Sequence, residues 1–181
     1  MLLRVMCFVA GCTLTFTLFA VSTASAEDWP TFRGPKRTAI APDKGLLTQW
    51  PAAGPKLVWE SAGAGRGYSS LAIAAGRIYT LGDAPSSAED KDEYLFCFDQ
   101  TDGKPLWKTK TGPPWKSGRE DWQSSRSTPT VDGDRVYALG AMGHLWCLKV
   151  DSGEVVWKKH LPTDFGTLDN LALKVCALDE F

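Results

Sequence analysis

The sequence has little of what metal and redox sites require. It contains two histidines and five cysteines, with no adjacent cysteine pair and no Cys-x-x-Cys. His144 and His160 stand apart in the sequence from any cysteine or carboxylate cluster. A zinc site is therefore not predicted, and we assign no metal ligand and no catalytic residue.

An excess of charge of one sign is also lacking. The chain has 20 Lys and Arg against 21 Asp and Glu, a formal net charge of −1. Nucleic-acid binding calls for a basic surface, and the aromatic residues are not interleaved with Lys or Arg clusters as base stacking would require. The sequence predicts no nucleic-acid partner.

An apolar run long enough to span a membrane is missing as well. A spanning helix needs about 20 apolar residues, whereas the run from Val5 to Ala20 is shorter and is interrupted by threonines. Arg4 precedes this run and Ala24-Ser25-Ala26 follows it. This is the pattern of a cleavable secretory signal, so we expect a signal peptide over 1–26 and an exported mature protein in the periplasm or cell envelope.

A lipoprotein signal is the less favoured alternative. Val9-Ala10-Gly11-Cys12 matches the pattern in which the cysteine is acylated, but the apolar run continues beyond Cys12. A membrane anchor is the third and weakest alternative. Without a leader, residues 27–181 are enough for one domain of ordinary size.

What the sequence does contain is an internal repeat. Residues 95–108 align with 145–158, so that Gly103 corresponds to Gly153 and Trp107 to Trp157, both at steps of 50. Repeats of this period are typical of solenoids and propellers. Shared glycine and tryptophan positions favour this interpretation over ordinary core tryptophans.

The upstream half of each repeat also matches. Residues 69–79 align with 127–137 at a step of 58, which places an eight-residue insertion in the first copy. The insertion falls within Gly82–Glu93, a polar stretch that we expect to be a solvated loop. A third partial match, Lys56–Glu60, aligns with the tryptophan strands alone.

Each repeat predicts four short antiparallel strands. In the second copy these are expected at 128–131, 135–139, 145–150 and 155–160, separated by turns rich in glycine and aspartate. One such meander cannot bury both faces alone, so the units pack face to face around a ring. The sequence predicts an all-β fold, an incomplete β-propeller of about two four-stranded blades plus a lone strand at 56–60.

The repeated residues are expected to dock neighbouring blades. An outer-strand tryptophan can lie across the blade seam, where its indole N–H reaches a backbone carbonyl. The structural docking residues are Trp59, Gly103, Trp107, Gly153 and Trp157. With only part of a ring present, the seams carrying Trp59 and Trp157 are expected to lack partners, so open blade faces predict self-association.

The repeat resembles a known motif. Cys97-Phe98-Asp99, Gly103-Lys104 and Trp107-Lys108 are similar to the tryptophan-docking motif of quinoprotein-like propellers, and 28–35 resembles the first segment of secreted propellers of that kind. The second copy departs from the motif, with Lys149 in place of the aspartate. The superfamily includes pyrroloquinoline quinone (PQQ) dehydrogenases and the propeller lipoprotein of the outer-membrane β-barrel assembly machinery.

The resemblance implies little about chemistry. A PQQ dehydrogenase holds calcium on carboxylate and amide oxygens, uses a catalytic aspartate and in many members has an adjacent cysteine pair, which this chain lacks. Cys97 and Cys147 occupy equivalent positions on different blades, too far apart for a disulfide, and are expected to be buried thiols. No cofactor is predicted, and PQQ enters by the resemblance alone.

Candidate binding residues gather in the long connections. The loops within Gly82–Glu93 and Thr111–Ser127 emerge on the same face of a propeller, and aromatic and arginine residues there are typical of recognition surfaces. The candidates for binding a protein or small-molecule ligand are Arg66, Tyr68, Trp115, Arg119, Trp122 and Arg126. The resemblance would place a quinone near Arg66, Tyr68 and Arg126, whereas the alternative is a structural role at the rim.

The chain is thus expected to have four parts. These are a signal peptide at 1–26, an N-terminal segment at 27–55 that leads into the propeller, blades at 56–166 and a divergent or truncated tail at 167–181. The favoured function is a ligand-binding, protein-binding or scaffolding module of the cell envelope. A quinoprotein oxidoreductase missing its catalytic blades is the alternative, and an outer-membrane protein assembly factor is a weaker one.

Overall fold

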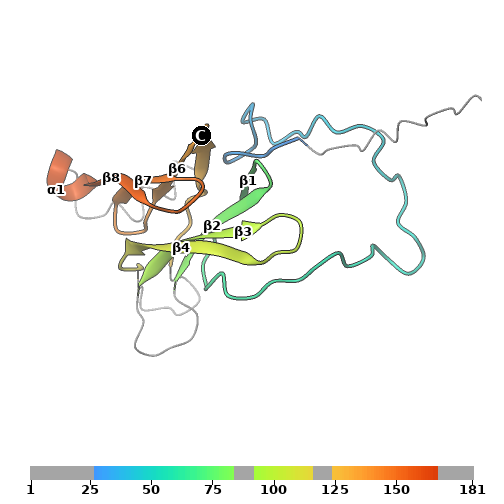
Figure 1. Ribbon diagram of the computed structural model, residues 1–181. Helices are drawn as coiled ribbons and strands as arrows, with labels where there is room; N and C mark the ends of the chain where they lie inside the picture. The colour runs from blue at the N-terminus through green and yellow to red at the C-terminus, as the bar shows by residue number, and fades with distance from the viewer. Residues whose placement is uncertain (1–26, 84–91, 116–123, 167–181) are drawn as a thin grey trace, which may run out of the picture.

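The protein consists of two four-stranded antiparallel sheets that lie side by side, as seen in a computed structural model (Figure 1). The structure describes residues 27–83, 92–115 and 124–166. The predicted signal peptide and the tail at 167–181 lie outside the described residues. In the described part of the chain, no helix is long and apolar enough to cross a membrane.

Both sheets are simple meanders, which we call blade 1 and blade 2. Blade 1 contains β1 (Ala72–Ala74), β2 (Arg77–Asp83), β3 (Glu93–Asp99) and β4 (Pro105–Gly112). Blade 2 contains β5 (Thr130–Asp132), β6 (Arg135–Leu139), β7 (His144–Lys149) and β8 (Val155–His160), followed by helix α1 (Leu161–Phe165). Neighbours in sequence are neighbours in each sheet, which confirms the predicted all-β, blade-like fold.

Two local expectations differ from the structure. The segment at 56–60 is not a strand. The stretch from Gly82 to Glu93 is not all loop, because Gly82 pairs with Tyr94 and Asp83 with Glu93 at the ends of β2 and β3. Asp83 and Glu93 are consequently buried, although their charge suggested a solvated loop.

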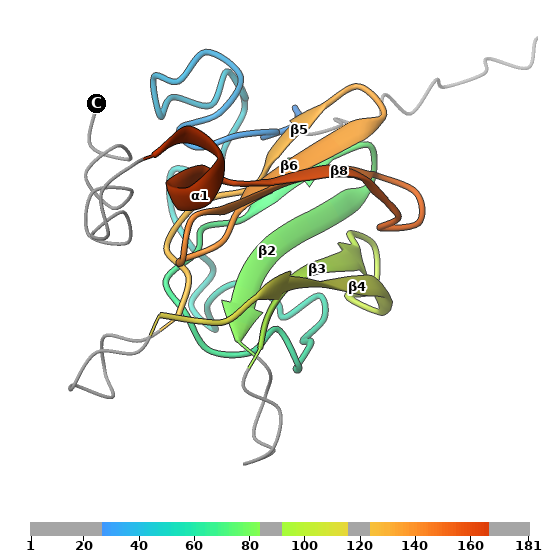
Figure 2. The same cartoon turned by 90° about the vertical axis from the view of Figure 1, so that its left-hand side faces the viewer.

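The main core lies between the blades, which face one another in Figure 2. Successive side chains of a strand point to opposite faces, so Tyr79, Leu81, Leu95 and Cys97 of blade 1 pack with residues of blade 2. The blade 2 members of this cluster are Val136, Ala138 and Leu148. Cys97 and Cys147 are buried free thiols.

The opposite face of blade 1 is also covered. Ile78, Phe96 and Phe98 form a second cluster, against which Trp59 and Ala64 of the segment before β1 pack. This segment therefore takes the place that a neighbouring blade would occupy. Trp59, which was expected to lack a partner, has one.

The same docking contact occurs twice, at steps of about 50 residues. The indole N–H of Trp107 donates to the carbonyl of Val150 at 3.0 Å, and the hydroxyl of Thr109 donates to the carbonyl of Gly153 at 2.7 Å. On the other side of blade 1, Trp59 donates to Gln100 at 3.0 Å and Ser61 donates to Gly103 at 2.6 Å. We call this arrangement the tryptophan dock.

The third tryptophan of the series has no equivalent dock in the described residues. Trp157 is 40% exposed, and its ring lies 6.1 Å from that of Tyr137 in its own blade. Val155 and Val156 beside it are exposed as well. The outer strand β8 therefore presents an uncovered apolar surface.

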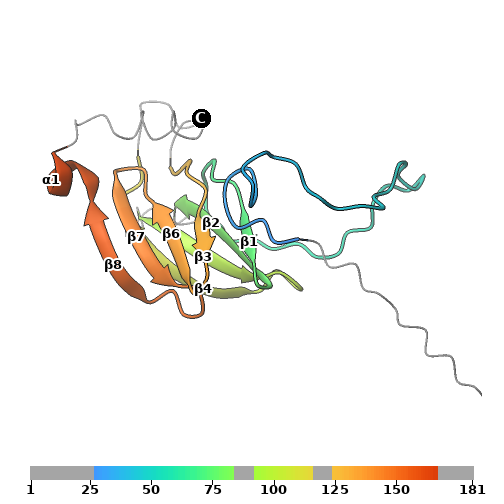
Figure 3. The ribbon, with the colours of Figure 1, turned by 90° about the horizontal axis from the view of Figure 1, so that it is seen from above.

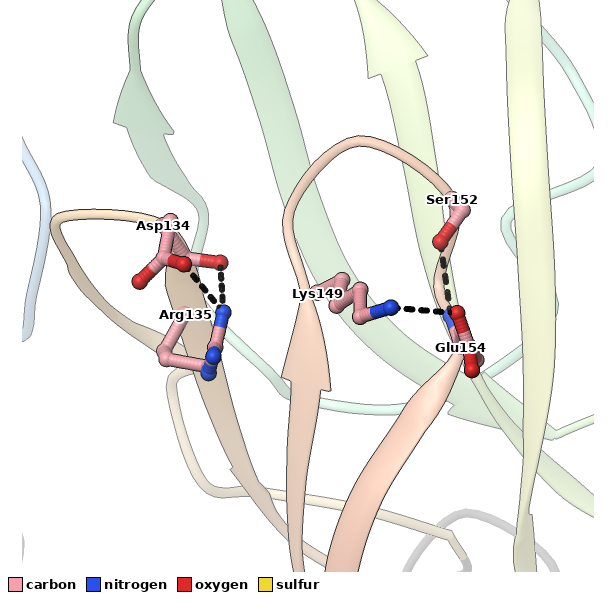
Figure 4. Close-up of polar contacts among 5 residues, drawn as sticks. All are labelled: Asp134, Arg135, Lys149, Ser152 and Glu154. Atoms are coloured by element: carbon pink, nitrogen blue, oxygen red, sulfur yellow. Dashed lines mark hydrogen bonds and ion pairs between the residues drawn. The ribbon is translucent and has the colours of Figure 1, made fainter.

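The turn that receives Trp107 keeps its shape despite the unusual Lys149. The Ser152 hydroxyl accepts the N–H of Glu154 at 3.2 Å, while the ammonium of Lys149 binds the Glu154 carboxylate at 2.7 Å (Figure 4). In blade 1, Asp102 accepts the N–H of Lys104 at 3.0 Å and binds its ammonium. In both turns a backbone N–H thus donates to the side-chain oxygen two residues earlier. The ion pair differs, because Lys104 binds Asp102 whereas its counterpart Glu154 binds Lys149.

The N-terminal segment joins the inner strands of both blades (Figure 3). Trp29 exchanges two backbone hydrogen bonds with Ile73 of β1, at 2.7 and 2.8 Å. Its neighbour Pro30 accepts the N–H of Val131 in β5 at 2.8 Å, and Asp28 accepts the N–H of Ala75 at 3.1 Å. Residues of the motif at 28–35 therefore hold the two blades together at their inner edges.

A glycine exchange tests the tryptophan dock. Gly153 has φ +68°, and a Cβ there would lie 2.4 Å from Cε3 of Trp107. Gly133 has φ +57° with nothing within 4 Å of such a Cβ. We expect Gly133→Ala to lower the free energy of unfolding by about 1–2 kcal/mol for its left-handed backbone, and Gly153→Ala to lower it by about 1–3 kcal/mol more.

Urea unfolding of the two variants followed by tryptophan fluorescence measures this difference. Equal losses in the two variants would show that the Trp107 ring does not depend on contact with the glycine turn.

Candidate functional site

One end of the blades gathers most of the candidate residues. At this end β2 finishes at Asp83, β3 starts at Glu93 and β4 finishes at Gly112, with Glu93 paired to both Asp83 and Gly112. The segment 124–129, which leads into β5, reaches the same place, because Tyr68 donates its N–H to the carbonyl of Ser125 at 2.8 Å. We call this end the loop rim.

Three of the six predicted binding residues come together at the loop rim. The guanidinium carbon of Arg126 lies 5.0 Å from the ring centroid of Tyr68 and 5.9 Å from that of Trp115. Both distances are within the range of cation–π attraction. Tyr68 is 58% exposed, whereas Arg126 and Trp115 are partly buried, so the cluster presents an aromatic surface around a cation.

Arg66 supports this cluster from the side. Its guanidinium pairs with the Asp83 carboxylate at 2.8 Å, and its backbone N–H donates to the same carboxylate at 2.8 Å. The backbone N–H of Asp83 in turn donates to the carbonyl of Arg66 at 2.9 Å. Glycine is needed here, because a Cβ at Gly65 would lie 1.7 Å from the carbonyl oxygen of Asp83.

The remaining two candidates, Arg119 and Trp122, lie outside the described residues. The structural residues Trp59, Gly103, Trp107 and Gly153 all belong to the tryptophan docks, and Trp157 lies on the surface of β8. Sequence reasoning missed Asp83 and Glu93. The one signal for them was two acidic residues flanking the polar insertion between two apolar strands.

Glu93 is a buried carboxyl group at the seam between the blades. Its side chain has no exposed surface, and Oε2 accepts the backbone N–H of Ala141 in the turn between β6 and β7 at 3.0 Å. The neighbouring Gly140 allows the approach, since a Cβ there would lie 3.0 Å from the same oxygen. Glu93 thus bonds blade 1 to blade 2 directly beneath the loop rim.

Burial raises the pKa of Glu93 to about 7, because water cannot solvate its charged form. The negative charge of Asp83 acts in the same direction, whereas the hydroxyl of Ser125 and the N–H of Ala141 oppose the rise. The hydroxyls of Thr111 and Ser124 are also buried, without a hydrogen-bond partner in the described part of the chain. Buried polar side chains therefore lie directly beneath the loop rim.

The described residues do not fit a calcium-bound quinone. Asp83 is already bound to Arg66, and Glu93 is enclosed between the blades. Among residues 27–83, 92–115 and 124–166 no three His, Cys, Asp or Glu side chains gather as metal ligands would. The side chains that the loop rim presents in the described residues are mainly aromatic and cationic.

Face-packed four-stranded meanders joined by tryptophan docks define a β-propeller module of the PQQ-like kind. The chain belongs to the family described as outer membrane protein assembly factor BamB, whose model matches residues 20–172. This agrees with the resemblance seen in the docking motif. No curated protein matches the sequence.

A solved structure shows the same fold. Quinohemoprotein alcohol dehydrogenase ADHIIG from Pseudomonas putida HK5 is 16% identical, with a TM-score of 0.54 over 74% of this chain and 19% of that one. Quinohemoprotein alcohol dehydrogenase from Comamonas testosteroni is 17% identical, with a TM-score of 0.47 over 75% of this chain and 19% of that one. BamB from Moraxella catarrhalis is also 17% identical, with a TM-score of 0.39 over 56% of this chain and 27% of that one. The chain spans about a fifth of the length of the two dehydrogenases.

The buried carboxyl group predicts a pH dependence of stability. Because the pKa of Glu93 is raised from 4.5 to about 7, folding favours its protonated form. Its contribution is therefore fully present below pH 4.5 and is lost as the pH rises to about 7. We expect Glu93→Gln to remove this loss, which is on the order of 3 kcal/mol.

Urea unfolding between pH 5 and pH 8 compares Glu93→Gln with the original chain. Glu154→Gln is the control, because Lys149 lowers the pKa of the exposed Glu154 carboxyl, which then titrates below this window. A parallel pH profile for the Glu93→Gln and original chains would contradict the assignment.

Proposed function

We propose that the chain is a binding or scaffolding module of the cell envelope, whose loop rim receives a protein partner. The observation that carries this proposal is the contact of the Arg126 guanidinium with the rings of both Tyr68 and Trp115. Aromatic and arginine side chains dominate binding energy where proteins meet. They lie in segments outside the strands that are tied together by backbone hydrogen bonds from Tyr68 to Ser125 and from Ser124 to Trp115, so little ordering is needed on binding.

The support from Arg66 fits this role. Two hydrogen bonds and an ion pair to the buried Asp83 fix the backbone just before Tyr68. The backbone bond from Tyr68 to Ser125 then fixes the other side of the cluster. A partner would meet a surface whose three binding side chains are already placed.

The family supports a narrower version of the proposal. Its description names an outer membrane protein assembly factor, which by analogy suggests that the partner belongs to the assembly of envelope proteins. The alternative, a quinoprotein oxidoreductase, has in its favour the structural likeness to an alcohol dehydrogenase, which concerns the fold alone. The donor set at the loop rim favours binding over oxidation.

Site-specific photo-crosslinking in the native envelope tests the binding surface. With p-benzoylphenylalanine at position 68 of the full chain, we expect a discrete adduct with a protein, and Arg126→Ala should abolish it because Arg126 orders both rings. The control is the photo-crosslinker at position 101, which is exposed in the turn between β3 and β4, at the other end of the blade. Equal adducts at the two positions, or none at position 68, would refute the proposal.

Export is the second part of the proposal. The first described contacts begin at Asp28, whose carboxylate binds Ala75, and at Trp29, which pairs with β1, so cleavage after Ala26 would leave the propeller contacts whole. We expect intact-mass analysis of the periplasmic protein to give an N-terminus at Glu27. A diacylglyceryl group on Cys12 would overturn cleavage at this site.

A further inference from the structure

Blade 2 carries a histidine pair at a position where blade 1 has different residues. His144 and His160 are register partners in β7 and β8, and their rings stack with centroids 4.3 Å apart. At the equivalent positions of blade 1, 50 residues earlier, Tyr94 pairs with Lys110. The blade fold therefore does not require the histidines.

The pair lies in a groove between the outer strands of the two blades. The groove has a volume of about 590 Å³ and is lined by Lys110 of β4, Trp146 of β7, Lys158 and Lys159 of β8 and the two histidines. A volume of this size suits a small organic ligand. The indole N–H of Trp146 is held by the carbonyl of Thr111 at 2.8 Å, which fixes the aromatic wall.

Positive charge dominates the lining. Lys158 lies with its ammonium 5.3 Å from the ring centroid of Trp146, and both Lys158 and Lys159 are exposed. The Lys110 ammonium is paired with Asp92 at 2.5 Å. Among the described residues that line the groove, one is acidic: Asp164 of α1, which accepts the backbone N–H of His160 at 3.0 Å.

The histidine rings are also oriented. His160 meets the hydroxyl of Thr163 through Nδ1 at 2.7 Å and the carbonyl of Met142 through Nε2 at 3.3 Å. Because a carbonyl only accepts, Nε2 carries a hydrogen, and the two contacts fix the orientation of the His160 ring. His144 stacks on this fixed ring.

We propose that this groove binds a small phosphate-bearing anion. Lys158 and Lys159 supply ammonium groups for the phosphate, a role in which lysine acts as a point charge. The faces of Trp146 and His144 pack against the organic part of the ligand. This site is separate from the loop rim and does not depend on the function proposed for it.

The charges around the histidines couple such binding to pH. Burial and the positive charges of His160 and Lys158 lower the pKa of His144, so its ring is neutral at neutral pH. A bound anion would offset those charges and raise the pKa of His144. By reciprocity, lowering the pH from 8 to 6 tightens anion binding.

Nuclear magnetic resonance of the histidine rings tests the site, with inorganic phosphate and glycerol 3-phosphate as probes on the mature chain. We expect saturable shifts of His144 and a higher pKa of its ring in the presence of either probe. The combined variant Lys158→Gln with Lys159→Gln should weaken binding by about tenfold or more, since each substitution removes a charged hydrogen bond to the phosphate.

The matched control is Lys108→Gln. Lys108 is the counterpart of Lys158 in blade 1, with its ammonium 4.7 Å from the ring centroid of Tyr94, but it does not line the groove. We expect it to leave phosphate binding unchanged. Equal weakening in the control, equal affinity for sulfate, or the absence of saturation would overturn the proposal.

Vesicles containing phosphatidylglycerol distinguish a lipid headgroup from a free phosphate. Saturable binding that requires Lys158 and Lys159 supports the site. If the vesicles bind, the ligand is a lipid headgroup, and if only glycerol 3-phosphate binds, it is a free phosphate compound. Vesicle binding that persists in the combined variant would contradict it.

Discussion

The tryptophan dock is the contact on which the rest of the structure depends. An indole N–H and a hydroxyl two residues later each reach a carbonyl of the neighbouring turn, and the ring lies against its glycine. Neither blade has enough apolar area to bury its faces alone, so the dock fixes how the blades meet. The seam contacts of Glu93 and Trp146 follow from that alignment.

The inner edge of the seam and the loop rim differ in chemistry. At the inner edge the 28–31 segment is bonded to both β1 and β5, whereas the loop rim rests on buried polar groups such as Glu93 and Thr111. Buried polar groups are costly when they lack partners. Part of the burial beneath the loop rim therefore costs free energy, whereas the inner edge is held by satisfied hydrogen bonds.

Much of the fold was predictable from sequence because the repeat is regular. The 50-residue steps of glycine and tryptophan predicted that Trp107 lies across the blade seam, and the turn residues located the strands of blade 2. The segment around Trp59 was predicted as a strand because it shares their pattern. In the described residues it makes the docking contacts of an outer strand but has no neighbouring strand to pair with.

The candidate site was predictable only in part. Arg126, Tyr68 and Trp115 stood out as residue types typical of recognition, but their stacking depends on contacts between segments far apart in sequence. Glu93 could not be foreseen, because its burial results from the pairing of β2 with β3 and the approach of the turn at Gly140. Charge pattern alone indicated a solvated loop.

The docks also give the stack of sheets a polarity. On the Trp59 side, blade 1 is capped by a short peptide that uses one ring and one hydroxyl. On the other side, β8 displays Trp157 with no turn against it in the described part of the chain. A neighbouring unit that covered β8 in the way that blade 2 covers β4 would therefore have to offer a glycine turn to Trp157.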